Sequence, residues 1–153
     1  PNSPMTSSPQ EMQRYLSKIS GPLLDRIDIH IEVTPVPFEK LSEERKGEGS
    51  VEIRKRVTAS REIQSERFKD FENVHYNAQM SVKQIRKFCK LSPESLTLLK
   101  TAMEKLNLSA RAYDRILKVS RTIADLANVT DISPDHIAEA IQYRSLDREG
   151  WLG

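Results

Sequence analysis

The sequence predicts a mainly α-helical protein, in which a bundle of helices follows one earlier helix and a single β-strand. Serine marks most of the expected helix starts, and proline follows it directly at Ser8, Ser92 and Ser133. A serine N-cap accepts a hydrogen bond from the free N–H groups of a helix start, and proline at the first helical position already has a helical φ. Residues 27–33 alternate apolar and polar side chains with the period of a strand. These signals predict the fold class.

The composition is that of one folded domain with appendages. The 153 residues are 37% hydrophobic and 30% charged, and the net charge of +2 does not by itself indicate a nucleic-acid partner. Cys89 is the only cysteine, so the chain can form neither an internal disulfide nor a cysteine metal cluster. It has no apolar run of the roughly 18 residues that span a membrane, and residues 1–9 lack the features of a signal peptide. We therefore expect a cytoplasmic protein without a membrane partner.

The N-terminal part contains the first helix and the strand. A capping box at residues 8–11 predicts a helix that ends near Ile19. The strand follows at residues 27–33, and its apolar face consists of Ile27, Ile29, Ile31 and Val33. A lone strand leaves its backbone groups unpaired and this face uncovered. Because no second strand follows, we expect it to pair either with another copy or with sequence outside this chain.

The rest of the chain predicts a connector and five helices. Residues 38–50 are charged and contain two glycines, as is typical of a connector. The helices are expected from Val51 to about Phe71, Ser81 to about Lys90, Ser92 to about Leu106, Ser109 to about Asn128 and Ser133 to about Leu146. In the first of them, the side chains expected to face inward are Ile53, Val57, Ile63 and Phe68.

The sequence contains no motif for independent catalysis. No glycine stands in a phosphate-binding loop, and His30, His75 and His136 lack the spacing of metal ligands. We expect a structural or solvent-exposed role for each histidine and a buried position for Cys89. No metal site, nucleophile–base pair or carboxylate pair is indicated. We do not expect enzymatic activity from this chain alone.

Arginines are the candidate functional residues. Arg26 stands between a Gly-Pro turn and the strand, where an exposed charge or an ion pair with Asp25 or Asp28 is the simpler interpretation. Arg111 and Arg115 share the face opposite the apolar stripe of the helix that Ser109 caps. That face is either solvated, with Asp114 and Lys118 as an ion pair, or directed at a polyanion such as a phosphate group.

The first long helix also concentrates cations, at Arg54, Lys55, Arg56, Arg61, Arg67 and Lys69. Acidic residues are interleaved with them, so a solvated face is a simpler interpretation than a nucleic-acid surface.

Three runs resemble segments of magnesium-chelatase-like AAA+ ATPases. Residues 20–33, SGPLLDRIDIHIEV, closely resemble the segment that carries the arginine finger of that family. Residues 108–126, LSARAYDRILKVSRTIADL, resemble its sensor-2 helix. Residues 51–68, VEIRKRVTASREIQSERF, are similar to the opening helix of its C-terminal lid. The resemblance covers nearly all of residues 8–146, and its first two motifs are specific.

The resemblance implies a division of the chain. Residues 1–37 would be the end of the AAA+ core, with the last strand of its sheet, and residues 38–50 a connector. Residues 51–146 would be the helical lid with the sensor-2 helix, and residues 147–153 a tail. The Walker A and Walker B segments that bind ATP would lie upstream of this chain and form its core partner.

The resemblance also implies roles for the arginines. Arg26 would act in trans as an arginine finger on ATP held by a neighbouring subunit of a homo-oligomeric ring, expected to be a hexamer. Arg111 would be the sensor-2 contact to the phosphates of its own subunit, and Arg115, one turn on, is the weaker candidate for cofactor binding. ATP and Mg²⁺ would be cofactors of the full-length protein, and we do not expect this chain alone to bind either tightly.

These motifs do not identify the substrate on which such a motor acts. The runs are most similar to the branch of the family that handles DNA in transformation and recombination, which favours DNA remodelling or branch migration. The chelatases proper drive the insertion of magnesium into porphyrin. From another class, the cations of residues 54–69 and 111–121 could form a stand-alone helical DNA-binding module. A helical protein-interaction domain is a third alternative without specific support.

Overall fold

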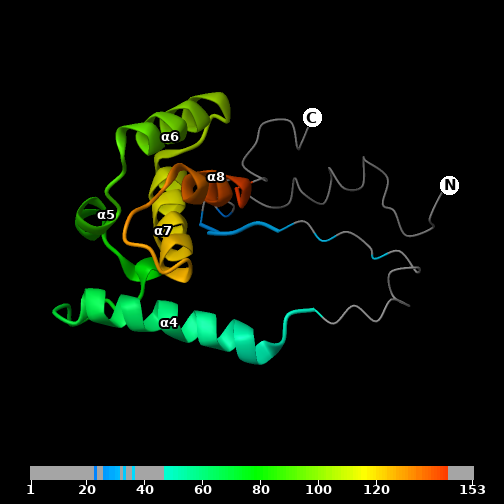
Figure 1. The fold of residues 1–153 in the computed structure, drawn as a ribbon. Coiled ribbons are helices and arrows are strands. Elements are labelled where there is room, and N and C mark those ends of the chain that lie inside the picture. Colours follow the sequence, from blue (N-terminus) through cyan, green and yellow to red (C-terminus); the bar gives the residue numbers. More distant parts are fainter. Residues whose placement is uncertain (1–22, 24–25, 32, 34–35, 37–46, 145–153) are drawn as a thin grey trace.

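A computed structural model describes residues 23, 26–31, 33, 36 and 47–144 of the chain (Figure 1). Its elements are α4 (Ser50–Phe68), the short 3₁₀ helix η1 (Asn77–Gln79), α5 (Val82–Phe88), α6 (Pro93–Lys105), α7 (Ala110–Leu126) and α8 (Pro134–Gln142). The predicted mainly α-helical fold is thus confirmed in this part of the chain. The helix expected at residues 8–19 and the tail lie outside the described residues, as does most of the connector, so the proposed division of the chain stays a prediction.

The helices begin and end where the capping residues indicate. Ser92 and Ser109 accept hydrogen bonds of 3.1 Å from the backbone N–H groups three residues later. At the opposite ends, Asn107 and Asn128 have positive φ angles of 47° and 56°. The N–H of the residue after each asparagine closes onto a carbonyl five residues back, as in a Schellman motif. These boundaries are therefore fixed by local chemistry.

The central helix of the bundle is α7, which packs against α4, η1, α5 and α8, while α6 packs on α8 (Figure 1). Its predicted apolar stripe is buried and includes Ala112, Ile116, Leu117 and Ala124. Around it, the core continues with Phe68, Met80, Ile85, Leu99, Ile132 and Ile137. None of the described helices is long and apolar enough to cross a lipid bilayer.

The first half of α4 differs from the sequence prediction. Ile53 and Val57 were expected to face inward but are 41% and 44% exposed, whereas Phe68 is buried as expected. Ile53 lies seven residues before the buried Ser60, and Val57 lies seven residues before the buried Gln64. Seven residues are about two helical turns, so all four side chains share one face of the helix. The face was predicted correctly, but this half of α4 extends away from α7 (Figure 1). The prediction of burial is wrong because α7 crosses α4 and covers only its second half.

Cys89 belongs to the core, as expected, and is 6% exposed at the end of α5. Burial raises the pKa of its thiol to about 11, and the guanidinium groups of Arg121 and Arg67 only partly oppose this shift. A thiol with this pKa stays protonated at neutral pH, and the thiolate is the reactive form. Cys89 is therefore a packing residue without nucleophilic character.

A buried polar network joins α4 to α7. The carboxylate of Asp125 has no exposed side-chain surface and accepts two hydrogen bonds from Arg67, at 2.5 and 2.6 Å. Arg121 donates to the same carboxylate at 3.1 Å, and the side-chain amide of Asn77 donates at 2.8 Å. The remaining donors of Arg121 reach the carbonyls of residues 129–130, in the loop before α8. One carboxylate therefore connects α4, η1 and α7, and Arg121 extends the network to the loop before α8.

Replacement of Asp125 by alanine should strongly destabilise the fold. It would leave two buried guanidinium groups without a counter-charge, and breaking a buried pair costs about 3–5 kcal/mol. Urea unfolding measures this loss in the free energy of unfolding. As a matched control, Glu104→Ala removes an exposed partner of Lys100, 3.9 Å away, and should cost less than about 1 kcal/mol. Equal losses in the two variants would show that the network does not stabilise the bundle.

Candidate functional site

The segment that carries Arg26 is held by two arginines of the helical bundle. Arg115, in α7, forms an ion pair with Asp28. Arg144, which follows α8 and is 1% exposed, donates to the backbone carbonyl of Ile27. Hydrogen bonds from a charged donor are stronger than those between neutral groups. The chain beside Arg26 is therefore fixed to α7 and to the end of α8.

Both faces of this segment meet the helices, but its polar face is the more deeply buried. His30 is buried, and its backbone N–H donates to the carbonyl of Tyr143 at 2.8 Å. In contrast, Ile29 and Ile31 are 45% and 73% exposed. The described residues of the segment form no strand ladder. The described residues thus cover the apolar face only in part, and the expected partner strand stays a prediction.

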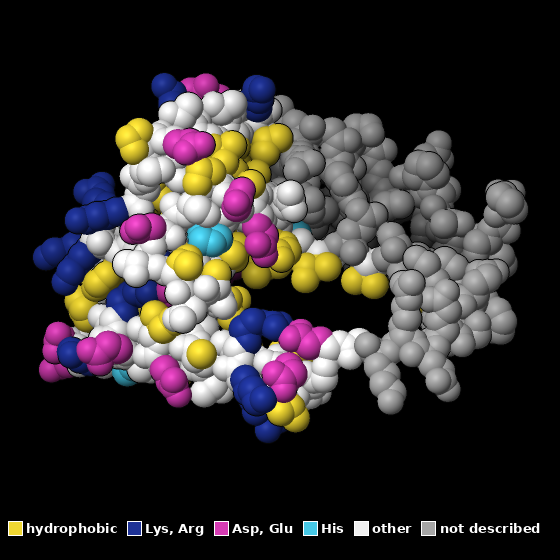
Figure 2. Space-filling view, viewed as in Figure 1, with side chains coloured by type: hydrophobic (Ala, Val, Ile, Leu, Met, Phe, Trp, Pro, Cys, Tyr) yellow, Lys and Arg dark blue, Asp and Glu magenta, His cyan; other side chains and the backbone are white. Residues whose placement is uncertain are grey.

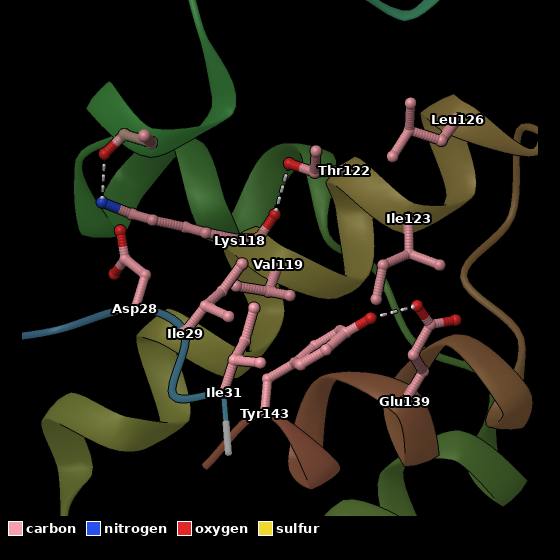
Figure 3. A pocket seen from close by; sticks show the side chains of 11 residues that line it. Asp28, Ile29, Ile31, Lys118, Val119, Thr122, Ile123, Leu126, Glu139 and Tyr143 are labelled. Atoms are coloured by element: carbon pink, nitrogen blue, oxygen red, sulfur yellow. Dashed lines mark hydrogen bonds between the residues drawn. The ribbon is translucent and has the colours of Figure 1, made fainter. Parts of the chain in front are cut away.

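An open pocket of about 340 Å³ lies between this segment, α7 and α8 (Figure 3). Isoleucine, valine and leucine side chains form most of its wall, and its polar groups are already paired. Lys118 donates to the carbonyl of Ala78 at 2.9 Å, and the hydroxyl of Tyr143 donates to Glu139 at 3.0 Å. Burial lowers the pKa of the Lys118 amine. The arrangement offers an apolar surface for contact and no nucleophile–base pair.

The three candidate arginines have different surroundings. Arg115 is half-buried and engaged with Asp28. Arg111, in the first turn of α7, is exposed and makes no hydrogen bond or ion pair with the described residues. Arg26 is also exposed, in a turn where its backbone N–H donates to the carbonyl of Leu23 at 3.0 Å. The structure therefore leaves Arg111, and not Arg115, accessible to a phosphate.

Lys118 does not form the expected ion pair with Asp114, because its amine is directed at Ala78. Most cations of α4 are likewise engaged, in the pairs Arg56–Glu48, Lys55–Glu52 and Lys69–Glu66. Arg61 stacks on the ring of Tyr76, with 3.9 Å from its guanidinium carbon to the ring centroid. Arg67 and Arg121 are bound to Asp125 inside the protein. The structure thus gives no support to a DNA-binding module built from residues 54–69 and 111–121.

The histidines have the structural or exposed positions that were expected. His136 accepts the N–H of Ser133 on its Nδ1 atom at 3.1 Å and so caps the start of α8. His75 is exposed, and its backbone N–H donates to the side chain of Gln79 at 2.7 Å. Within the described part of the chain, no three His, Cys, Asp or Glu side chains gather as a metal site would require.

Two residues that shape the site were missed from the sequence. Arg144 reaches back to Ile27 across 117 positions, and no local pattern indicates this contact. Asp125 did have a signal, because it lies beside the buried Ala124 in the apolar stripe, four residues after Arg121. A carboxylate and an arginine at that spacing on a buried face indicate an internal ion pair.

Comparison with known proteins matches both parts of the chain. Residues 47–144 match the family described as magnesium chelatase, subunit ChlI C-terminal, and residues 1–41 match magnesium chelatase, subunit ChlI. The chain is 46% identical over 143 residues to the competence protein ComM of Haemophilus influenzae, covering 93% of this chain and 27% of that protein.

Two relatives without an assigned function are similar over nearly the same part. The uncharacterized protein YifB of Salmonella typhimurium is 40% identical over 142 residues, which cover 92% of this chain and 27% of that protein. The uncharacterized protein Rv2897c of Mycobacterium tuberculosis is 34% identical over 132 residues, which cover 86% of this chain and 26% of that protein. The chain therefore spans only about a quarter of the length of the relatives it matches.

Proposed function

The chain belongs to the magnesium chelatase ChlI family, and from this premise we propose that it is the sensing and triggering part of a ring-forming AAA+ ATPase of the ComM type. Arg26 is the arginine finger that reaches the ATP of a neighbouring subunit. Arg111 is the sensor-2 residue that contacts the ATP phosphates of its own subunit. The longer protein supplies the segments that bind ATP and Mg²⁺.

The observation that carries this proposal is the attachment of the Arg26 segment to the helix that bears Arg111. Asp28 is ion-paired with Arg115, which lies one turn after Arg111 in α7. A shift of α7 on nucleotide binding would therefore move the finger segment with it. Such a link between a sensor and a trigger is a physical route by which one ATP site influences the next.

The surroundings of the two α7 arginines support different roles for them. Arg111 is exposed at the N-terminal end of α7, where the helix dipole favours an anion. Its guanidinium can bind phosphate oxygens with two parallel hydrogen bonds. The guanidinium of Arg115 already binds Asp28. We therefore assign phosphate contact to Arg111 and positioning of the finger segment to Arg115.

The exposed part of the apolar face supports a larger assembly. Ile29, Ile31 and Val33 are exposed side by side along the segment. Burial of such a side chain contributes about 1.5–3 kcal/mol, so a covering surface would be strongly stabilising. In this proposal the cover is the core sheet of the longer protein, to which residues 27–33 add the last strand.

We propose that the motor acts on DNA, because the relative ComM is named for competence, which is the uptake of DNA. The alternative substrate is a porphyrin, which the family name of magnesium chelatase implies. We expect branched DNA, and not a porphyrin with Mg²⁺, to stimulate ATP hydrolysis by the full-length protein. Stimulation by porphyrin alone would favour the alternative.

Full-length protein with Arg26→Ala should assemble and bind ATP but hydrolyse it roughly 10³-fold or more slowly, because an arginine finger stabilises the charge that develops during phosphoryl transfer. The matched control is Arg54→Ala, which removes an exposed arginine of α4 and should leave turnover unchanged. Normal turnover in the Arg26 variant would overturn the finger assignment.

A mixing experiment tests action in trans. Arg26→Ala subunits are combined with subunits whose phosphate-loop lysine is substituted, each inactive alone. Activity should return, because an intact ATP site then meets an intact finger from its neighbour. A mixture that stays inactive, with ring assembly confirmed, would show that Arg26 does not act across the interface.

The positioning role of Arg115 predicts a specific pattern in a double-mutant cycle. Arg115→Ala and Asp28→Ala should each lower kcat roughly 2- to 30-fold with little change in the KM for ATP, and the double variant should be no worse than either. A phosphate contact by Arg115 would instead raise KM in the Arg115 variant alone, with effects that add in the double variant.

A further inference from the structure

A cluster of exposed cations lies on and directly after α5. Residues 81–93 contain four cations and no acidic residue, and all four side chains are exposed. We call Lys83, Arg86, Lys87 and Lys90 the α5 patch. Figure 2 shows lysine and arginine side chains gathered over α5. Positions three and four apart lie on one face of a helix, so Lys83, Arg86 and Lys87 point to the same side, opposite the buried Ile85.

The cations of the α5 patch are not neutralised as those of α4 are. Lys83, Arg86 and Lys90 make no ion pair with the described residues. Lys87 lies over the rings of Phe71 and Phe88, with 5.5 and 5.0 Å between its amine and the ring centroids. Contact with an aromatic ring holds the amine in place and leaves its charge uncompensated. The patch therefore presents four positive charges to its surroundings.

The helix dipole accounts for only part of this arrangement. Arg86 and Lys87 stand in the last turn of α5, where a cation is stabilising. Lys83 stands in the first turn, where a cation is destabilising, and like charges three or four positions apart repel. Stability of the helix alone does not explain Lys83, so the cluster is better explained by an anionic partner.

The interior behind the patch adds to the positive potential. Arg67 and Arg121 share the single carboxylate of Asp125, which leaves one net positive charge. Both guanidinium groups line a groove of about 510 Å³ together with Lys87 and Lys90. A low-dielectric wall next to such charges strengthens the field in the groove.

The acids that share a groove with the patch are few. Glu66 and Asp131 line the groove of Lys87 and Lys90, and Glu66 is already paired with Lys69. On the other side of α5, Asp114 lines a groove with Arg86. These carboxylates border the patch and do not cover it.

We propose that the α5 patch binds the phosphate backbone of duplex DNA. Duplex DNA carries one negative charge per about 1.7 Å of its axis, so a surface with several neighbouring cations can contact several phosphates at once and bind more tightly. Three of the four cations are lysines, which suit phosphate contact better than bidentate reading of bases. A membrane or an amphipathic acidic peptide would call for large apolar anchors gathered on one face. The exposed large apolar side chains that share a groove with the patch, Val82, Leu96 and Val129, are divided between two grooves. This surface is separate from Arg26 and Arg111, so the inference does not depend on their proposed roles.

Fluorescence anisotropy of the 153-residue chain with a labelled duplex of about 20 base pairs tests the proposal over roughly 25 to 200 mM NaCl. Contact with up to four phosphates predicts a slope of log K against log salt of about −3 to −4. The variant Lys83→Gln/Arg86→Gln/Lys90→Gln should bind at least about 10-fold more weakly at low salt, with a slope near −1. Circular dichroism should show unchanged helix content, because all three side chains are exposed.

The matched control is Arg54→Gln/Lys100→Gln/Lys105→Gln, which removes the same charge from exposed positions of α4 and α6. Its affinity should stay within about 2-fold of the unchanged chain, since these cations lie outside the patch. Loss of binding in both triple variants would show a net-charge effect and overturn the proposal, as would absence of binding at low salt. Polyglutamate of equal charge is the competitor, and competition as effective as that of unlabelled duplex would indicate an acidic protein partner instead.

Discussion

The carboxylate of Asp125 is the interaction on which the bundle depends. It is wholly buried between the guanidinium groups of Arg67 and Arg121. A charge buried without a partner costs several kcal/mol, so these three side chains must be buried together or not at all. Because Arg67 comes from α4 and Arg121 also holds residues 129–130, one network sets the positions of α4 and of the loop before α8 against α7. Apolar packing around α7 is non-directional and could not by itself select these orientations.

The same constraint limits which cations of α7 can meet a ligand. Arg121 is buried and bound to Asp125, and Arg115 is ion-paired with Asp28 on another side of the helix. Arg111 is left exposed at the start of the helix. The helix α7 thus carries an ion pair to α4 and another to the Arg26 segment. The proposed link between nucleotide sensing and finger position would need both of these contacts to persist when α7 moves.

Local chemistry and long-range contacts differ in how far the sequence could predict them. The ends of α6 and α7 were predictable because serine caps and asparagines in the left-handed region act within one turn. The pairing of Arg67 with Asp125 joins residues 58 positions apart, and an arginine in a charged helix carries no local sign of its partner. The exposure of Val57 was unpredictable for a related reason, since helical periodicity defines a face but not how much of that face the neighbouring helix covers. Arg111 and Arg115 share one face in the helical pattern, and the resemblance already ranked Arg111 first, but the engagement of Arg115 with Asp28 was visible only in the structure.

The two uncovered surfaces of the molecule require chemically different partners. The exposed isoleucines beside Arg26 are stabilised only by an apolar cover, whereas the α5 patch is stabilised by anions. In Figure 1 the Arg26 segment leads away from the bundle on the side opposite α5. A surface that covers the isoleucines would therefore leave the α5 patch open. In the proposed ring, the helical domain could then be docked on its core and hold DNA at the same time. Because α5 packs against α7, a movement of α7 with nucleotide would also shift the patch. The two proposals taken together would therefore make one helix, α7, position both the finger and the DNA contact.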